Sequence, residues 1–402
     1  MSQLARTHVI LKGKENSAET RTTIDTAMVS SAANAPLFRP KFPNAGINDS
    51  GVIGVSYSSF GDFSNMARLY VLGARQKKLR LIQEEEWNLY ETGLILEIDT
   101  ETGTVQTRVE YQTPENARST DKASHIFKAG TLRGDFLYAA TATEAIVFKV
   151  PEFERIGYVS LPTFNDVHHV SPSIDGNLMA VSTGLDMVIK FTLDGKTLAE
   201  WPVLDQDPWA RFSRTVDYRK VPSTKPHKAH PNFVFELGKE VWVTRLTQRD
   251  AVCLTHPGQR IDIAVQRPHD GLVCGDRIYF TTVDGQIVIA NAKTHTVDEV
   301  IDLKLINGQN SLLGWCRGLL PFGDGKIWVA FTRVRKTNFL ENVLWVKNIV
   351  REGMGEKPTH IGLYDLAKKE CLAEVDMEAH GLNIIFSIFA APETAMQPKT
   401  CP

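Results

Sequence analysis

Long apolar runs and an excess of charge of either sign are both missing from this 402-residue sequence. No stretch approaches the ~20 apolar residues of a membrane-spanning helix, and the N-terminal residues contain no apolar segment of the kind found in signal peptides. The 45 basic and 47 acidic side chains give a formal net charge of -2, so no long-range field attracts nucleic acid or an anionic membrane. We expect a cytoplasmic protein whose partner is a small-molecule substrate, without nucleic acid or membrane binding; the sequence leaves the oligomeric state open.

Paired cysteines are missing as well. The five cysteines are odd in number, scattered and never form a C-x-x-C pair, which argues against a disulfide framework or a structural zinc site. The motifs of P-loop, dinucleotide-binding, H-E-x-x-H and G-x-S-x-G sites are also absent. Hydrophobic residues nevertheless make up 43% of the chain, enough for a large buried core. We expect a folded protein of a reducing compartment whose chemistry rests on some other arrangement.

The informative feature of the sequence is a repeated unit. Each copy has a polar or histidine-led approach, a short apolar strand, a turn with Gly or Asp, a second strong strand and a hairpin of two further strands. Five copies begin at SHIFKAGTL (Ser124), HHVSPSIDG (His168), HPNFVFELG (His230), HDGLVCGDR (His269) and RGLLPFGDG (Arg317). Their leading positions are about 40 to 60 residues apart, the period of a four-stranded blade with loop insertions. The sequence therefore predicts an all-β fold, a β-propeller.

Two weaker copies complete the predicted ring. One runs from INDSGVIGVSYSS (Ile47) into GLILEIDTETGTVQTRVEY, and the other begins at HGLNIIFSIFAAP (His380) and lacks an outer hairpin. We therefore expect seven blades, with six or eight as alternatives, in a single domain over residues 1–402. The segment 1–40 is expected to add a strand, THVILKG, that closes the last blade. Short helical insertions on one face are predicted in FLENVLWVKNIVREG (Phe339) and within FSNMARLYVLGARQKKLRLIQEEEW.

Histidines recur at the leading position of these copies. The innermost strand of every propeller blade starts near the central axis, so residues at that position converge from all sides. The leading position holds a histidine in most copies, namely His125, His168 or its neighbour His169, His230, His269 and His380. Arg317 takes the same position in the remaining copy. The sequence thus predicts a ring of imidazoles around the axis.

A ring of neutral imidazoles with few carboxylates suits a transition metal better than Ca²⁺ or Mg²⁺, which prefer oxygen ligands. Fe(II) is favoured, because four histidines on an octahedral ion leave two positions for substrate and dioxygen; Cu or Zn would satisfy the same ring. The sequence does not decide between His168 and His169, nor which four or five histidines form the site. The alternative is that each histidine is a capped or solvated residue at a strand start.

Polar neighbours of the leading positions are candidates for orienting the imidazoles. Asp270, Asn165, Asp166 and Asn232 each lie beside one, and such groups can accept the second N–H of a ring. They are equally common as turn formers. Arg317, within GWCRGLL, would place a guanidinium at the ring, where it can bind a substrate carboxylate or else hydrogen-bond carbonyls between blades. Asp270 and Arg317 are the candidate catalytic residues.

The segments GWCRGLLPFGDGKIWVAFTR and RPHDGLVCGDRIYFTTVDGQIVIAN resemble a poorly characterised group of bacterial propeller proteins, in which an axis residue precedes a strong strand. This resemblance covers roughly residues 120–390 and implies the fold but no reaction. A more distant similarity is to the carotenoid cleavage oxygenases, seven-bladed propellers that hold a non-heme iron with four histidines from four blades. That similarity implies a metal in the channel on His125, His168 or His169, His230, and His269 or His380.

These observations favour a metal-dependent oxidoreductase, a mononuclear non-heme iron enzyme acting on a small substrate that is carboxylated if Arg317 binds it. One alternative is a metal-dependent lyase or hydrolase that uses metal-bound water. The other is a non-catalytic propeller that binds a ligand or a protein.

Overall fold

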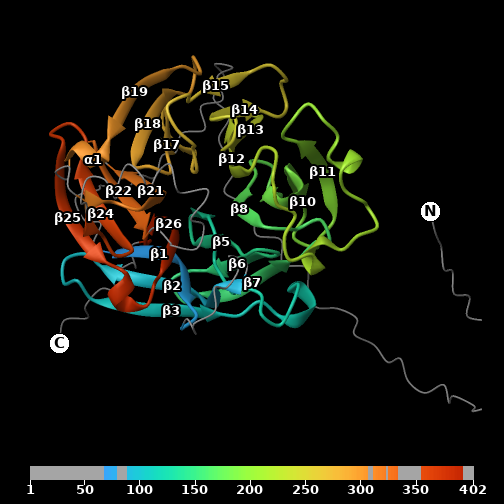
Figure 1. The fold of residues 1–402 in the computed structure, drawn as a ribbon, viewed down its shortest axis with the longest axis horizontal. Helices are drawn as coiled ribbons and strands as arrows, with labels where there is room; N and C mark the ends of the chain where they lie inside the picture. The colour runs from blue at the N-terminus through green and yellow to red at the C-terminus, as the bar shows by residue number, and fades with distance from the viewer. Residues whose placement is uncertain (1–67, 79–87, 307–310, 323–324, 334–354, 393–402) are drawn as a thin grey trace, which may run out of the picture. The chain divides into compact units, whose positions relative to one another are not determined.

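The structure, a computed structural model, describes residues 68–78, 88–306, 311–322, 325–333 and 355–392. Within these residues the chain forms six four-stranded sheets arranged around a centre (Figure 1). The predicted all-β propeller is therefore confirmed. Among the described residues, no helix is both long and apolar enough to cross a membrane.

Each of the six four-stranded sheets is antiparallel. The first sheet has the strand order β26 (Ile384–Ala390), β1 (Arg68–Gln76), β2 (Tyr90–Asp99) and β3 (Val105–Tyr111). The second has the order β4 (Gly130–Arg133), β5 (Phe136–Ala140), β6 (Ala145–Lys149) and β7 (Glu154–Val159). The third has the order β8 (Val167–Pro172), β9 (Leu178–Ser182), β10 (Met187–Phe191) and β11 (Thr197–Pro202).

The other three sheets repeat this pattern. The fourth contains β12 (Pro231–Leu237), β13 (Glu240–Arg245), β14 (Asp250–Cys253) and β15 (Arg260–Asp262). The fifth contains β16 (Leu272–Cys274), β17 (Arg277–Thr281), β18 (Gln286–Asn291) and β19 (Val297–Asp302). The sixth contains β21 (Trp315–Phe322), β22 (Lys326–Thr332), β24 (His360–Asp365) and β25 (Glu370–Asp376). A short parallel pair, β20 (Ser311–Leu312) and β23 (Gly355–Glu356), stands apart.

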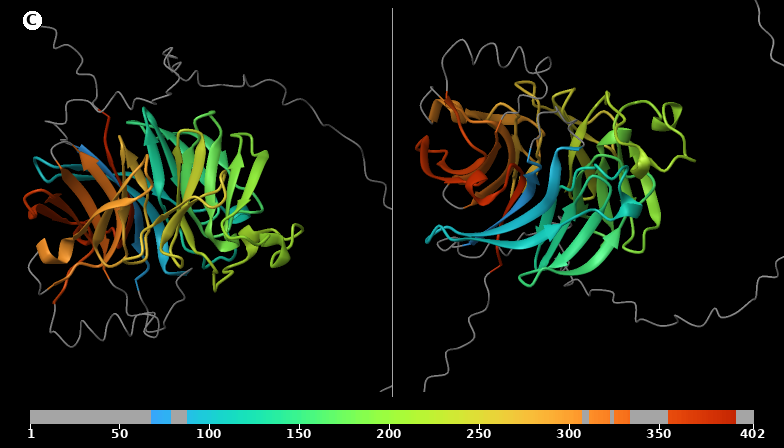
Figure 2. Two further views of the ribbon diagram at one scale, coloured as in Figure 1. Left: turned by 90° about the horizontal axis from the view of Figure 1, so that it is seen from above. Right: turned by 60° about the horizontal axis from the view of Figure 1, so that its bottom comes forward.

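Neighbouring sheets contact one another around a closed ring. β4 contacts β8, β8 contacts β12, β12 contacts β16, β17 contacts β21, β21 contacts β26, and β26 contacts β4. The first strand of each sheet therefore lies innermost. Figure 2 shows the same ribbon from two further directions.

Apolar side chains fill the seams between sheets. Tyr138 and Val147 of the second sheet pack in one cluster with Ile189 of the third. Trp242 of the fourth sheet, the largest of the fully buried side chains, lies in a cluster with Ile278 of the fifth. Because both faces of a blade are covered, inner strands such as β8 are buried along their whole length.

The described residues form six blades, which was the alternative to the seven expected. The two weak copies are halves of one blade: GLILEIDTETGTVQTRVEY lies in β2 and β3, and HGLNIIFSIFAAP supplies β26 of the same sheet. A blade split between distant parts of a chain resembles two incomplete repeats, which explains the error. The ring is closed by β26 pairing with β1, with Leu69 opposite Ala390. The segments THVILKG and INDSGVIGVSYSS, for which the closing strand and a first strand were predicted, lie outside the described residues.

The helix predicted within FSNMARLYVLGARQKKLRLIQEEEW is wrong over Arg68–Gln76, which forms β1. Residues 69–74 are all buried between β26 and β2, so their apolar run is that of an internal strand. FLENVLWVKNIVREG lies outside the described residues. The described helices are all short, namely η3 (Glu115–Ala117), η4 (Thr183–Leu185), η5 (Pro208–Ala210), η6 (Tyr218–Lys220), α1 (Leu303–Ile306) and η7 (Glu378–His380).

We expect Gly73→Ala to weaken ring closure. A Cβ atom at Gly73 would lie 1.7 Å from the carbonyl oxygen of Ile384, a backbone atom of β26 that must then move. The free energy of unfolding, measured by urea denaturation, should fall by about 3 kcal/mol or more. Gly103→Ala is the matched control: its φ is 71° and no atom lies within 4 Å of the added Cβ, so only the backbone strain of about 1–2 kcal/mol should be lost. Equal losses in the two variants would contradict the importance of this contact.

Candidate functional site

The starts of the innermost strands bring three of the six predicted histidines together. His168 is the second residue of β8, His230 directly precedes β12, and His269 lies shortly before β16. The ring centroids of His168 and His230 are 5.0 Å apart, and those of His168 and His269 are 6.1 Å apart. Three imidazoles from three consecutive blades therefore meet, as the repeat predicted.

Two further blades contribute Arg317 and Phe386 to the same place. The ring of Phe386, in β26, lies 6.3 Å from that of His168 and 5.8 Å from that of His269. The guanidinium carbon of Arg317, in β21, lies 4.6 Å from the centroid of Phe386, within the range of a cation–π contact. We call His168, His230, His269, Arg317 and Phe386 the axial cluster.

β-Bulges accompany three of these residues. In the ladder between β8 and β9 the register skips His168, and in that between β26 and β1 it skips Phe386. The register between β21 and β22 skips Gly318, next to Arg317. A bulge leaves a residue without a partner on the neighbouring strand and re-aims the side chain, which is how inner strands with buried faces present polar groups at the centre.

His269 and the adjacent Asp270 form a buried pair. Oδ1 of Asp270 lies 3.1 Å from Nδ1 of His269. Oδ2 accepts hydrogen bonds from the Thr281 hydroxyl and the Gly318 N–H, both at 2.6 Å. The carboxylate thus places the proton of the ring on Nδ1 and leaves Nε2 as an acceptor. Nε2 is buried and has no hydrogen-bond partner among the described residues.

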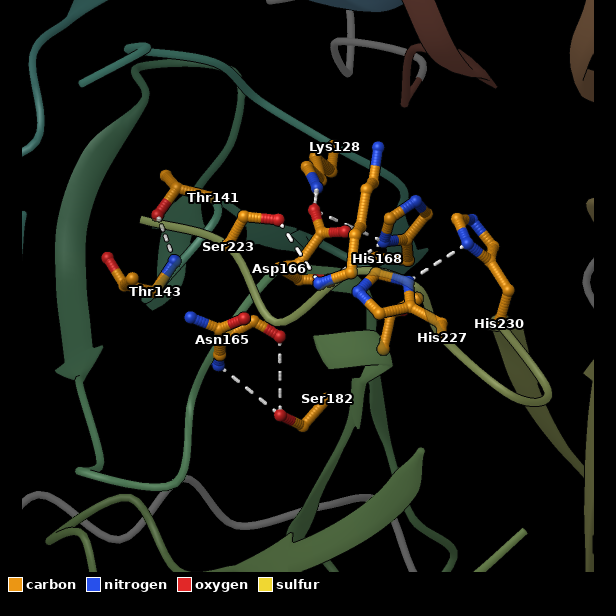
Figure 3. A network of polar contacts seen from close by, with 12 residues as sticks. Lys128, Thr141, Thr143, Asn165, Asp166, His168, Ser182, Ser223, His227 and His230 are labelled. Atoms are coloured by element: carbon orange, nitrogen blue, oxygen red, sulfur yellow. Dashed lines mark hydrogen bonds and ion pairs between the residues drawn. The ribbon is translucent and has the colours of Figure 1, made fainter. Parts of the chain in front are cut away.

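His168 has the same tautomer for a different reason. Its Nδ1 lies 2.7 Å from the backbone oxygen of Asp166, so Nδ1 donates and Nε2 is again the acceptor. The Asp166 carboxylate forms an ion pair with Lys128 (Figure 3). Burial alone would raise the pKa of Asp166, but the Lys128 ammonium holds it well below its ordinary value. Lys128 is buried beside the axial cluster, and its charge is paired with that of Asp166.

Asp186 fixes the loop that carries His230. Its carboxylate accepts backbone N–H bonds from residues 228–230 at 2.9–3.1 Å and pairs with Arg211 at 2.8 Å. These bonds hold His230 at φ 52°, in the left-handed region that costs a non-glycine residue about 1–2 kcal/mol. Nδ1 of His230 lies 3.1 Å from Nδ1 of His227 (Figure 3), so one ring donates and the other accepts.

His169 has a structural role. Its ring stacks on Phe233 with centroids 3.6 Å apart, Nε2 lies 3.1 Å from the Gly130 oxygen, and Nδ1 accepts the Val234 N–H at 3.2 Å. Both ring nitrogens are therefore engaged. Of the two adjacent histidines, the structure presents His168 to the axial cluster.

His125 and His380 are not brought to the axial cluster. His125 lies in the segment before β4, and its Nδ1 accepts the Thr113 N–H at 3.0 Å. The residue of this blade that corresponds to His269 is Lys128, two positions before β4: its N–H donates to the Ala140 oxygen, as the His269 N–H donates to the Thr281 oxygen. His380 is an exposed residue of η7, and β26 supplies Phe386 in its place.

Among the predicted polar neighbours, Asp166 and Asp270 contact axial imidazoles, whereas Asn165 and Asn232 do not. The Asn165 amide donates to two carbonyls at and after η6, both at 2.8 Å. The Asn232 amide donates to the Pro268 carbonyl at 3.1 Å. These two asparagines therefore tie loops to the sheets.

Sequence reasoning missed Lys128, Asp186, His227 and Phe386. Lys128 was missed because the nearest histidine, His125, was taken as the leading residue of its repeat. Its place just ahead of an inner strand could have identified it. Phe386 reads as a core residue in the apolar run of β26. Asp186 acts on backbone groups more than forty residues away, which leaves no local signal.

Burial keeps the axial imidazoles neutral. It lowers the pKa of His168 well below the ordinary value, that of His230 to about 3, and that of His269 in spite of Asp270. Burial alone would raise the pKa of Asp270, but its bonds with His269, Thr281 and Gly318 lower it. At neutral pH the site therefore combines neutral imidazoles with buried carboxylates and the Arg317 cation.

A metal site needs at least three ligand atoms close together. Among the described residues, three ligand atoms of His, Cys, Asp or Glu side chains lie within 4.8 Å of one another at Glu240, Cys253 and His256, but not in the axial cluster. An open pocket of about 400 Å³ lies between Ile306 and Glu374 and shares no residue with the axial cluster.

The sequence matches no protein-family model and no curated protein. Similar solved structures include a protein of unknown function from Bacteroides caccae, with 12% identity, 81% of this chain and 100% of that chain covered, and a TM-score of 0.50. The nidogen/laminin complex follows with 9% identity, 81% and 100% coverage and a TM-score of 0.47. A catalytically inactive virginiamycin B lyase from Staphylococcus aureus with quinupristin has 13% identity, 59% and 70% coverage and a TM-score of 0.38. The first of these likenesses shows the fold alone, and none of the three supports the similarity to carotenoid cleavage oxygenases.

Acid should destabilise the folded propeller. Burial lowers the pKa of His169 and of His230 from 6.5 to about 3, so between those values the unfolded chain binds protons that the folded chain does not. The contribution of these neutral imidazoles to the free energy of unfolding should be complete above pH 6.5 and decrease as the pH drops towards 3. For His169 alone the decrease should be at most about 1.4 kcal/mol per pH unit.

Urea unfolding between about pH 8 and 4 measures the slope of the free energy of unfolding against pH. His230→Asn should flatten the slope, because Asn has no titratable ring. Asn also tolerates the left-handed backbone of this position, so the substitution adds little strain. His380→Asn, at an exposed position, should leave the slope unchanged. An unaltered slope in His230→Asn would refute the lowered pKa of His230 in the folded protein.

Proposed function

We propose that the axial cluster is the active site of a general acid–base enzyme, a lyase that removes a proton from a small carboxylated substrate. The observation that carries this proposal is Nε2 of His269. It is buried, it has no partner among the described residues, and it belongs to a ring whose other nitrogen is fixed by Asp270.

His269 has the properties of a base. Burial lowers its pKa, so the imidazole is neutral and able to accept a proton at neutral pH. The Asp270 carboxylate orients the ring and stabilises the imidazolium that proton transfer forms. Asp270 acts through His269 and is a positioning residue for this chemistry.

Arg317 supplies the positive charge for an anionic substrate. A guanidinium can bind a carboxylate through two parallel hydrogen bonds. Arg317 lies against Phe386 and is close enough to His269 to act on its charge. Lys128, which is ion-paired with Asp166, also acts on the charge of His269. A carboxylate bound here would have its adjacent carbon near the base, and the guanidinium would stabilise the negative charge that develops there.

Elimination balances with these groups alone. Nε2 of His269 takes the proton from the carbon next to the carboxylate, and the electrons of that C–H bond form a double bond as the leaving group departs with its bonding pair. The imidazolium then returns the proton to the leaving group. Cys316, beside Arg317, is a poor nucleophile because burial raises the pKa of its thiol well above the ordinary value.

Exchange of carbon-bound protons in D₂O tests the proposed base without knowledge of the leaving group. A panel of small carboxylic acids with a hydroxyl, amino or acyloxy substituent is incubated with the protein and followed by ¹H NMR. A matching compound should exchange its proton next to the carboxylate, and His269→Asn should slow this exchange by about 100-fold or more. Arg317→Met should raise the half-saturating concentration by about tenfold or more.

His380→Asn is the control for removal of an imidazole, since His380 is exposed and outside the axial cluster. Its exchange rate should equal that of the unmodified protein. An exchange rate in His269→Asn as high as in this control would overturn the proposal.

A second candidate keeps the metal predicted from the sequence. His168 and His269 both hold Nδ1 against an oxygen acceptor, the arrangement typical of histidines that bind metal through Nε2. With His230 they would hold a borderline ion, Fe(II), Cu or Zn. Fe(II) would supply the redox chemistry of an oxidoreductase, and Zn a Lewis acid for a lyase or hydrolase. The Arg317 cation weighs against this candidate, and so does the spacing of the three rings, whose ligand atoms do not all lie within 4.8 Å of one another.

Elemental analysis of the purified full-length chain separates the candidates. A metal centre in the axial cluster predicts about one Fe, Cu or Zn per chain that is lost in His168→Ala and in His269→Ala but retained in His380→Ala. A metal content that is the same in all three variants would exclude axial metal. If the His269 and Arg317 variants alter neither metal content, ligand binding nor proton exchange, the axial cluster is not the functional site and both enzymatic candidates lose their basis.

A further inference from the structure

Glu240, Cys253 and His256 lie together on the fourth sheet, outside the axial cluster. One potential ligand atom from each comes within 4.8 Å of the other two. An oxygen of Glu240 lies 3.2 Å from Nδ1 of His256, and Sγ of Cys253 accepts the backbone N–H of His256 at 3.3 Å. Three different donor types, a carboxylate, a thiol and an imidazole, therefore face one another.

The fold holds these residues in place. Glu240 is the first residue of β13, and Cys253, the last of β14, pairs in register with Trp242 of β13. Hydrogen bonds fix the turn after β14 to both strands. The Cys253 N–H donates to the Gln259 oxygen at 3.1 Å, and the Leu254 N–H donates to the Val241 oxygen at 2.7 Å. The C-x-x-H spacing thus presents Sγ and the imidazole on one side of a fixed turn.

The surroundings of each donor favour a metal-bound form. A backbone N–H directed at Sγ stabilises the negative charge of a thiolate. The Trp242 indole N–H donates to one oxygen of Glu240 at 3.3 Å, which orients the carboxylate while the other oxygen faces His256. Cys253 is 5% exposed, whereas the His256 side chain is 61% exposed, so the group opens to solvent on one side.

The donor set selects the class of ion. Ca²⁺ and Mg²⁺ prefer oxygen ligands, so a thiolate disfavours them, whereas zinc binds cysteine sulfur, histidine nitrogen and carboxylate oxygen alike. Zinc is tetrahedral, so three protein ligands leave one position. Here that position would lie on the exposed side and be taken by water or by a donor from another molecule.

We propose that Glu240, Cys253 and His256 form a zinc site with an open fourth position. This inference is independent of the function proposed for the axial cluster, because none of its three residues belongs to that cluster. The competing explanation is an ordinary exposed ion pair between Glu240 and His256. An ion pair does not involve the Cys253 thiol, whereas the zinc site requires it as a ligand.

Cobalt(II) added to the full-length chain under reducing conditions reports on the thiol directly. We expect a thiolate-to-cobalt charge-transfer band that saturates at one equivalent and is abolished by one equivalent of zinc. Cys253→Ser should remove this band and weaken zinc binding, measured by competition with a chromogenic chelator, by about tenfold or more. Glu240→Gln and His256→Asn should weaken zinc binding in the same direction.

Two control variants make the result specific. Cys274→Ser removes a partly exposed thiol of β16 and should leave the band intact. His269→Ala removes an axial imidazole and should also leave it intact, which separates this site from any metal in the axial cluster. Circular dichroism confirms that each variant is folded. Cobalt binding without a thiolate band, or unchanged zinc affinity in Cys253→Ser, would overturn the proposal.

Discussion

The pairing of β26 with β1 is the constraint on which the rest of this structure depends. Five blades are local units of the chain, but the sixth exists only when the strand Ile384–Ala390 pairs with Arg68–Gln76. That pairing leaves no open seam between the first and last blades, since β26 also contacts β21 and β4. It also carries Phe386 to the centre, where His168, His269 and Arg317 all lie against the phenyl ring.

The sequence was sufficient for the parts of the fold that are local. Each unit beginning at Ser124, His168, His230, His269 or Arg317 contains its own inner strand, turn and outer hairpin, and all five form the predicted sheets. The blade number was wrong because the pairing of the sixth blade is long-range and leaves no trace in a repeat pattern. The apolar segment of β1 was mistaken for part of a helix because a strand buried on both faces lacks the alternation that marks a strand.

The site was predictable only to within a few residues along each inner strand. Successive side chains of a strand point to opposite faces, so His168 and His169 have opposite fates, the one at the centre and the other stacked on Phe233. A bulge at His168 decides between them, and bulges depend on the partner strand. The same uncertainty assigned His125 to the position that Lys128 occupies. The bonds from Asp186 to the loop of His230 could not be foreseen, because they form between segments that only the folded ring brings together.

Asp270 has a double attachment that joins chemistry to architecture. Its carboxylate holds His269 and Thr281 of the fifth blade, and through the Gly318 N–H it is also fastened to the sixth. A small sliding of these two blades past each other would stretch the bond to Gly318 and leave more negative charge for the imidazole. The proton affinity of His269 is therefore sensitive to how tightly the two blades are joined, and a substitution that loosens this joint would change the basicity of the ring without touching it.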